Sequence, residues 1–132
     1  MLTRNDILKG KNLPEEYTGN LDILVARLNK LENLSGIKFQ ISSGFRDPSD
    51  QIRIYKQKGI TDLKKIPMAS KHFYCQAADL VCPELDKLKD WIKDNLATVE
   101  EIGFWFEEFA ATPNWVHCQI VPPKSGRRFY MP

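Results

Sequence analysis

The sequence lacks the long hydrophobic segments of membrane and exported proteins. No apolar run approaches the roughly 20 residues that a membrane-spanning helix requires. Residues 1–17 contain charges of both signs and no apolar stretch of signal-peptide length. We therefore expect no membrane span and no export signal, and a chain that is made in the cytoplasm.

The sequence also has few cysteines and a small net charge. The three cysteines, Cys75, Cys82 and Cys118, form no CxxC pair, and an odd number fits neither a disulfide framework nor a cysteine zinc knuckle. Cysteines of this kind are typical of small, reduced core residues. The net charge is only +2, and the basic residues are spread along the chain, so we expect no nucleic-acid partner.

The chain does contain enough apolar residues for one core. Of its 132 residues, 42% are hydrophobic and 27% are charged, as in ordinary folded domains. No repeat, linker or low-complexity segment divides the sequence. We therefore expect a single domain over residues 1–132, and a monomer.

Cap residues and apolar spacing predict four helices. Thr3 and Asp6 have the spacing of a capping box before a short first helix. Asp47 followed by Pro48 is typical of the N-cap and first residue of a later helix. Residues at helical spacing predict the core helix of the fold: Leu21, Leu24, Val25, Leu28, Leu31 and Leu34. The predicted helices cover residues 3–10, 19–36, 47–57 and 83–96.

Alternation of polar and apolar residues predicts four strands, and Pro113-Asn114 has the composition of a hairpin loop between the last two. Residues 59–69 are predicted to form a loop. Helices before and between the strands, with a terminal hairpin, indicate an α+β fold with a small, largely antiparallel sheet and helices packed on one face. The predicted strands cover residues 37–42, 76–82, 102–109 and 115–121.

Strand geometry brings three polar residues towards one face of this sheet, because side chains alternate between the two faces of a strand. In the last strand His117 lies on the face away from the core, between Trp115 and Gln119. In the second strand Asp79 lies opposite the apolar face. His72 precedes that strand and can reach the same face from a loop.

These three residues have the composition of a metal site. Burial of the Asp79 carboxylate without a partner would be costly, and a cation would remove that cost. Two imidazoles and one carboxylate are typical of catalytic zinc, with water in the fourth position. The alternative is that His72 and His117 are ordinary structural or surface histidines, and the pattern His-x6-Asp alone does not exclude it.

A zinc-bound water also needs a general base, and two glutamates precede the predicted hairpin. Phe104 and Phe106 indicate the core face of that strand, so Glu107 faces the site and Glu108 does not. A bulge near Phe109 would exchange the two glutamates. Both are otherwise typical of a solvated strand end.

Three segments match motifs that occur together. Residues 70–79, SKHFYCQAAD, resemble S-x-H-x-x-G-x-A-x-D. Residues 42–48, SSGFRDP, resemble T/S-S-G-Y/F-R-S/D-P, and residues 115–117, WVH, resemble W-x-H. In this order they resemble the zinc D-alanyl-D-alanine carboxypeptidase family, which also contains phage L-alanyl-D-glutamate endolysins and shares its fold with the hedgehog signalling domain. The resemblance covers about residues 38–121.

The resemblance implies a role for each matching position. His72, Asp79 and His117 would bind zinc, and a glutamate shortly before W-x-H would be the base, which strand alternation assigns to Glu107. Arg46 would lie near the metal and bind a carboxylate or stabilise an oxyanion. The alternative role of Arg46 is a structural salt bridge.

The resemblance also implies a substrate, the peptides of peptidoglycan with their D-amino acids. Ser70, Gln51 and Trp115 would line the substrate groove; a loop or helix cap is the alternative for Ser70 and Gln51, and a core position for Trp115. The sequence departs from the family at Cys75, which replaces a glycine, and at Asn114, where many relatives have the catalytic glutamate. If position 75 needs a positive φ, cysteine costs about 1 kcal/mol there, and its thiolate is also a conceivable zinc ligand.

Three functions are compatible with these residues. The first is a zinc peptidase that cuts cell-wall peptides, as in a phage or prophage lysis protein released by a holin or carried in a virion. The second is a zinc-containing module that binds peptide or wall fragments without cutting them. The third is a metal-free structural or interaction domain.

Overall fold

The computed structural model describes residues 1–66 and 70–132 of the chain, and the last part of the predicted 59–69 loop lies outside them. The helices are α1 (Arg4–Leu8), α2 (Thr18–Ser35), α3 (Pro48–Gln57), α4 (Leu85–Asp94) and α5 (Leu96–Ile102). Short 3-10 helices are η1 (Glu15–Tyr17), η2 (Leu63–Lys65), η3 (Lys71–Tyr74) and η4 (Phe109–Ala111). The strands are β1 (Gln40–Ser43), β2 (Ala77–Val81), β3 (Trp105–Glu107), β4 (Val116–Gln119) and β5 (Phe129–Tyr130).

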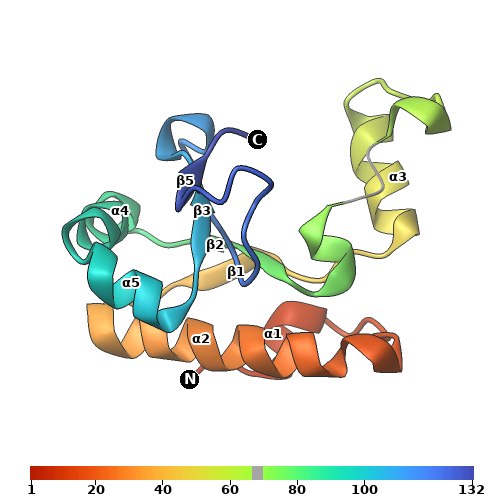
Figure 1. Cartoon of the computed structure of the whole chain (residues 1–132). Coiled ribbons are helices and arrows are strands. Elements are labelled where there is room, and N and C mark those ends of the chain that lie inside the picture. The colour runs from red at the N-terminus through yellow and green to blue at the C-terminus, as the bar shows by residue number, and fades with distance from the viewer. Residues whose placement is uncertain (67–69) are drawn as a thin grey trace.

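The five strands form one sheet in the order β1-β2-β4-β3-β5 (Figure 1). The pairs β1–β2, β2–β4 and β3–β4 are antiparallel, whereas β5 is parallel to β3 at the edge. This arrangement confirms the predicted α+β fold with a small, largely antiparallel sheet. It also adds the edge strand β5, which the sequence did not predict.

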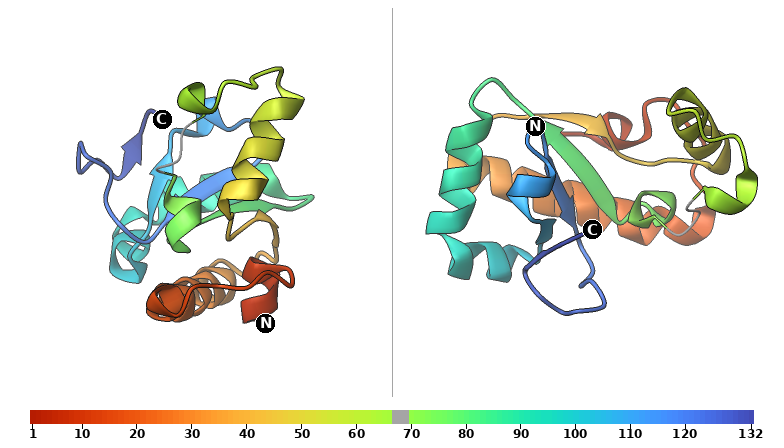
Figure 2. Two further views of the ribbon diagram at one scale, coloured as in Figure 1. Left: turned by 90° about the vertical axis from the view of Figure 1, so that its right-hand side faces the viewer. Right: turned by 90° about the horizontal axis from the view of Figure 1, so that it is seen from above.

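Helix α2 runs beneath the sheet (Figures 1 and 2) and buries more apolar side chains than any other helix of the described residues. Its buried residues are Leu21, Leu24, Leu28 and Leu31. They belong to the same apolar cluster as Ala78 and Leu80 of β2 and Val116 and Cys118 of β4. The opposite face of β2 and β4 carries the polar residues, as strand alternation predicts.

The predicted helix starts agree with the cap geometry. Thr3 and Asp6 form a reciprocal capping box before α1. Asp47 accepts a hydrogen bond from the Asp50 amide at 2.9 Å, and Pro48 is the first residue of α3.

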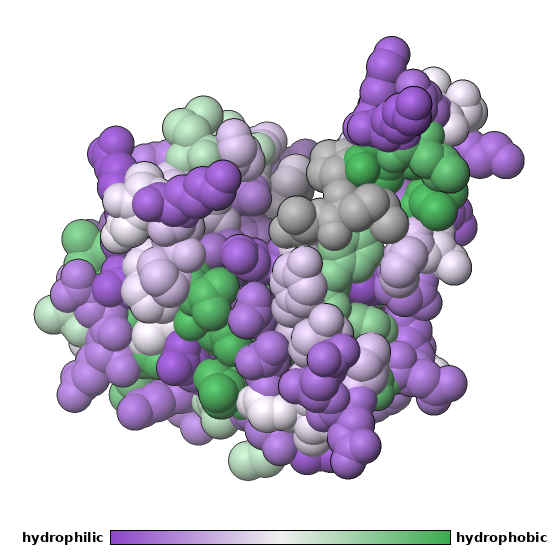
Figure 3. All heavy atoms as spheres, turned by 45° about the vertical axis from the view of Figure 1, so that its right-hand side comes forward, coloured by the Kyte–Doolittle hydropathy of each residue, from purple (hydrophilic) through white to green (hydrophobic). Residues whose placement is uncertain are grey.

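Helix α3 stands at one end of the molecule, with α4 and α5 at the other (Figure 1). On the face drawn in Figure 3, hydrophilic residues predominate and hydrophobic side chains gather only in small groups.

Two predictions, one of a strand start and one of a core residue, were wrong. Ile102 was predicted as the first residue of a strand, but it is the last residue of helix α5, which was not predicted, and it is buried there. Gly103 adopts φ 99°, which ends the helix, and the strand is limited to Trp105–Glu107. The predicted core residue Leu34 is 50% exposed, since it lies in the last turn of α2.

None of the helices within the described residues is both long enough and apolar enough to span a bilayer.

The contrast between two leucines of α2 gives a test of this packing. Leu28 is completely buried, so Leu28→Ala should lower the free energy of unfolding by about 2–5 kcal/mol. Leu34→Ala, on the same helix, should change it by less than about 1 kcal/mol. Urea unfolding of both variants in the presence of a chelator measures the difference. Equal destabilisation by the two substitutions would contradict the position of α2 in the core.

Candidate metal centre

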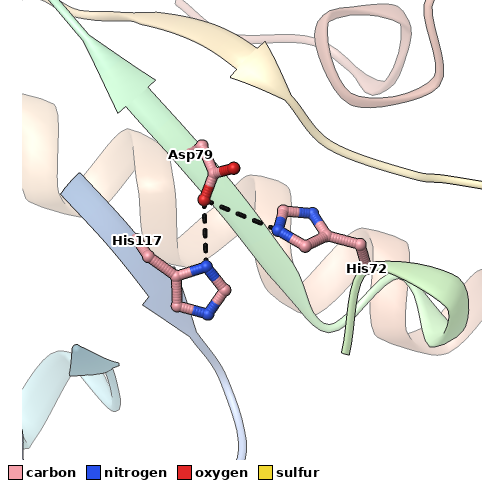
Figure 4. A group of neighbouring side chains, drawn as sticks. All are labelled: His72, Asp79 and His117. Atoms are coloured by element: carbon pink, nitrogen blue, oxygen red, sulfur yellow. Dashed lines mark hydrogen bonds and ion pairs between the residues drawn. The ribbon is translucent and has the colours of Figure 1, made fainter. Parts of the chain in front are cut away.

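His72, Asp79 and His117 converge on one face of the sheet (Figure 4). Asp79 of β2 and His117 of β4 are directly paired across the two strands. His72 comes from η3, immediately before β2. All three side chains are buried, with exposed fractions of 3%, 9% and 7% for the residues in chain order. The sheet thus assembles the three polar residues that strand alternation had grouped.

The distances among the three side chains suit a small cation. Oδ1 of Asp79 lies 2.9 Å from Nδ1 of His117 and 3.5 Å from Nε2 of His72. One ligand atom from each residue lies within 4.8 Å of the other two. In tetrahedral zinc sites with ordinary bond lengths, the ligand atoms lie about 3.4 Å apart. The distance between Oδ1 of Asp79 and Nδ1 of His117, 2.9 Å, would therefore have to increase by roughly half an ångström. The residues therefore fit a zinc ion with little rearrangement.

Local structure fixes the orientation of His72. The Ser70 hydroxyl accepts a hydrogen bond from the backbone amide of His72 at 3.3 Å and caps η3. Nδ1 of the ring lies 2.7 Å from the carbonyl oxygen of Gly44. Because a carbonyl can only accept, Nδ1 donates a proton to it, and Nε2, on the side of Asp79, is the nitrogen that remains to bind a metal. An outer hydrogen bond of this kind is common for metal-binding histidines.

Gly44 can occupy its position because it has no side chain. A Cβ atom there would lie 2.5 Å from the carbonyl oxygen of Ile7 and 2.9 Å from its Cα. The next residue, Phe45, donates its amide to the same Ile7 oxygen at 3.0 Å. Helix α1 therefore supports the loop whose carbonyl orients His72.

Cys75 follows η3 in the left-handed conformation, with φ 57°. This is the strained case anticipated for a cysteine that replaces a glycine, at a cost of about 1 kcal/mol. The side chain is completely buried in the apolar core. Burial raises the pKa of its thiol to about 12, so the thiol stays protonated at neutral pH. Within the described residues, the metal-binding group comprises His72, Asp79 and His117 and does not include this cysteine.

Arg46 and Glu107 flank the group on opposite sides. Nη2 of Arg46 lies 3.5 Å from Oδ2 of Asp79, and its Nε donates to the Ser43 hydroxyl at 2.9 Å. Oε1 of Glu107 lies 3.9 Å from Nε2 of His117. In the described part of the chain, Glu107 and Asp79 are the carboxylates within 4.0 Å of these histidines.

Glu108, the alternative base, lies elsewhere. It lines two surface hollows with Arg127 and Phe129, one of which also includes Lys93. The strand β3 keeps its regular register opposite β4 up to Phe106, so no bulge exchanges the two glutamates in this segment. The two glutamates therefore differ in position: Glu107 lies beside His117, whereas Glu108 lines surface hollows.

The remaining predicted residues differ in burial. Ser70 acts as the cap of η3, and Gln51 is 2% exposed in α3. Trp115 is half-buried immediately before β4. A cavity of about 340 Å³ is lined in part by Arg46, Phe73 and Tyr74, and its described lining includes none of the three candidate metal ligands.

Asp79 and His117 shift each other's pKa in the directions that favour a charged pair. Burial raises the pKa of the Asp79 carboxyl, but hydrogen bonds from His117 and His72 outweigh burial and hold that pKa well below its ordinary value. Burial lowers the pKa of His117, yet its hydrogen bond to Asp79 and the nearby Glu107 carboxylate raise that pKa overall. The two residues therefore form a buried ion pair when a proton occupies the space between them.

Sequence reasoning assigned no role to Gln119, which contacts His117, or to Tyr130, which contacts Gln119. Gln119 was placed on the correct face but without a function, and its contact with His117 is visible only in the structure. Tyr130 belongs to β5, whose two residues are too few to show alternation.

No protein-family profile matches this chain, and no curated protein matches it in sequence. The metal-binding geometry therefore carries the functional argument.

The Asp79–His117 pair predicts a pH dependence for the metal-free protein. The lowered pKa of Asp79 stabilises the fold above the ordinary carboxyl pKa, about 4, and this contribution is lost as pH falls through the folded value. The raised pKa of His117 stabilises the fold below the ordinary imidazole pKa, about 6.5, and this contribution is lost as pH rises through the folded value.

The difference in unfolding free energy between wild type and Asp79→Asn should therefore be largest between about pH 4 and 6.5, and should narrow on either side. Urea unfolding in a chelator across this range measures it. Asp22→Asn is the matched control, because Asp22 makes an exposed ion pair with Arg4 and should contribute little at any pH. A difference that stays constant across the range would contradict the predicted pair.

Proposed function

We propose that the protein is a zinc-dependent peptidase that hydrolyses the peptides of peptidoglycan. The observation that carries the proposal is the convergence of His72, Asp79 and His117, whose ligand atoms lie within 4.8 Å of one another. Zinc held by two histidines and one carboxylate lowers the pKa of bound water to about 7 and polarises a carbonyl. The other residues are assigned the tasks of binding the substrate and moving protons.

Arg46 is the proposed substrate-orienting residue. Its guanidinium lies at the edge of the metal group and also contributes to the neighbouring cavity. In that position it can bind a substrate carboxylate or stabilise the oxyanion that forms at the attacked carbonyl. Glu107 is the proposed general base, because a carboxylate beside the metal group can accept the proton of the attacking water.

The proposed substrate class rests on the three motifs and is supported by the shape of the site. The cavity beside Arg46 is lined by Tyr17, Phe45, Phe73 and Tyr74, with charged residues at its rim. A lining of aromatic side chains with a few charged groups suits a short peptide that has both methyl groups and carboxylates. Cell-wall peptides have this composition.

The proposed route to the substrate follows the phage lysis proteins that the motifs resemble. The chain would be made in the cytoplasm and reach the cell wall through a holin or as part of a virion.

A zinc-containing module that binds wall peptides without cutting them is the second candidate. Glu107 favours it, because in this conformation the carboxylate approaches the outer nitrogen of His117 rather than the nitrogen nearest Asp79. Asn114 favours it as well, since an amide cannot take a proton from water. Both candidate functions use the same metal site, but only the peptidase would hydrolyse the bound peptide.

Two glutamate variants test the assignment of the base. Glu107→Gln should retain about one zinc per chain and lower the rate of peptide release from purified peptidoglycan by about 10²–10⁴-fold. Glu108→Gln is the matched control and should keep the wild-type rate, because Glu108 lies beside Arg127 and Phe129. Released amino groups and elemental zinc are measured on the same preparations.

Each of the other outcomes identifies a different function. Zinc with affinity for wall peptides but no release by the wild type would establish the binding module. A zinc content well below one per chain after zinc-replete purification would leave only a metal-free domain. An unchanged rate in Glu107→Gln would exclude Glu107 as the base.

A further inference from the structure

A second set of hydrogen bonds surrounds the outer nitrogen of His117. Nε2 of the ring lies 3.1 Å from Oε1 of Gln119, two residues further along β4. The side-chain amide of Gln119 donates to the carbonyl oxygen of Val121 at 2.9 Å. The hydroxyl of Tyr130, from β5, donates to the same Oε1. The amide of Gln119 is therefore held from both ends, and its oxygen faces His117.

This arrangement determines which nitrogen of His117 can bind a metal. Because Oε1 of Gln119 can only accept, Nε2 of His117 must carry the proton that joins them. In the metal-free protein a second proton lies between Nδ1 and Oδ1 of Asp79, which are 2.9 Å apart. A metal ion can replace this proton, and the lone pair of Nδ1 then faces the metal while Nε2 keeps its own proton. His72 has the converse arrangement, with Nδ1 on the Gly44 carbonyl and Nε2 towards Asp79.

Gln119 has little freedom to leave this position. It is 2% exposed, and its backbone is paired with Ala77 on one side and Trp105 on the other. Tyr130 is held by the edge strand, where the amide of Glu108 donates to the Tyr130 carbonyl at 2.8 Å. Burial, and the nearby Glu107 carboxylate, raise the pKa of the Tyr130 phenol, so its hydroxyl remains a donor at neutral pH.

We propose that Gln119 and Tyr130 are positioning residues of the metal site: Tyr130 orients Gln119, and Gln119 holds the proton of His117 on Nε2 so that Nδ1 is the metal ligand. The inference rests on the proposed zinc site and adds two residues that act on it without touching the metal. Outer partners of metal-binding histidines increase the basicity of the ring and fix its orientation. The last strand of the sheet thereby becomes part of the metal centre.

Three variants separate positioning from simple packing. Gln119→Met keeps the size of the side chain and removes the acceptor, so the dissociation constant for zinc should rise about 10–100-fold. Gln119→Glu keeps an acceptor that faces Nε2 but loses the donor to the Val121 carbonyl, so zinc should bind more tightly than in Gln119→Met. Tyr130→Phe removes one hydroxyl, and its effect should be about three- to tenfold.

Competition with a chromophoric chelator at neutral pH measures the dissociation constants, and Gln57→Met on the exposed end of α3 is the control. Nitrogen-15 spectra of histidine-labelled protein supply a second readout. In the wild type, with or without zinc, the Nε2 proton of His117 should be protected from exchange with water. In Gln119→Met this protection should be lost while the far-ultraviolet circular dichroism stays unchanged.

The outcomes distinguish this inference from the proposed function. If the wild type binds zinc but Gln119→Met binds it within twofold of the wild type, the positioning role is wrong and the zinc site stands. If Gln119→Glu is as weak as Gln119→Met, Gln119 acts by packing alone and the proposal is overturned. If the wild type binds no zinc, the proposed function fails, and the Nε2 proton in the metal-free protein still decides whether Gln119 controls the protonation of His117.

Discussion

The pairing register of β2 and β4 is the constraint on which the site depends. It sets Asp79 beside His117 and, on the other face, Ala78 beside Cys118 in the core. A slip of one residue would turn the polar side chains into the core and bring apolar ones to the site. Because the apolar face packs on the leucines of α2, hydrophobic burial opposes that slip. The spacing of the three candidate metal ligands is thus maintained by core residues that lie outside the candidate site.

Strand pairing continues on both sides of β2 and β4, with one irregularity in β1 between Ile41 and Ser43, and this explains why much of the site could be predicted. Ser43 pairs with Asp79, Asp79 with His117, and Glu107 with Tyr130. Alternation along a strand is a local property, so the sequence alone places Asp79, His117 and Glu107 on one face. The starts of α1 and α3 were equally predictable, since their capping boxes are formed by residues within one turn.

Features that depend on distant contacts could not be predicted in this way. Strand β5 has two residues and exists because the amide of Phe106 donates to the carbonyl of Arg128, just before the strand, and the amide of Glu108 donates to that of Tyr130. The left-handed conformation of Cys75 is stable because the thiol is buried in the core, which outweighs a local preference for glycine. The apolar spacing near Ile102 fits a helix end as well as a strand, and only packing against α2 distinguishes them. Each of these features is determined by tertiary structure, which no local pattern encodes.

The hydrogen bond between His72 and Gly44 has a consequence for the order of assembly. Through Gly44, His72 is supported by Ile7 of α1, whereas its partner His117 lies in β4. The three candidate ligands and this support therefore span residues 7 to 117. During synthesis on the ribosome, the three side chains can come together only after residue 117 has emerged. A metal ion bound by all three would thus require β2 and β4 to be paired already.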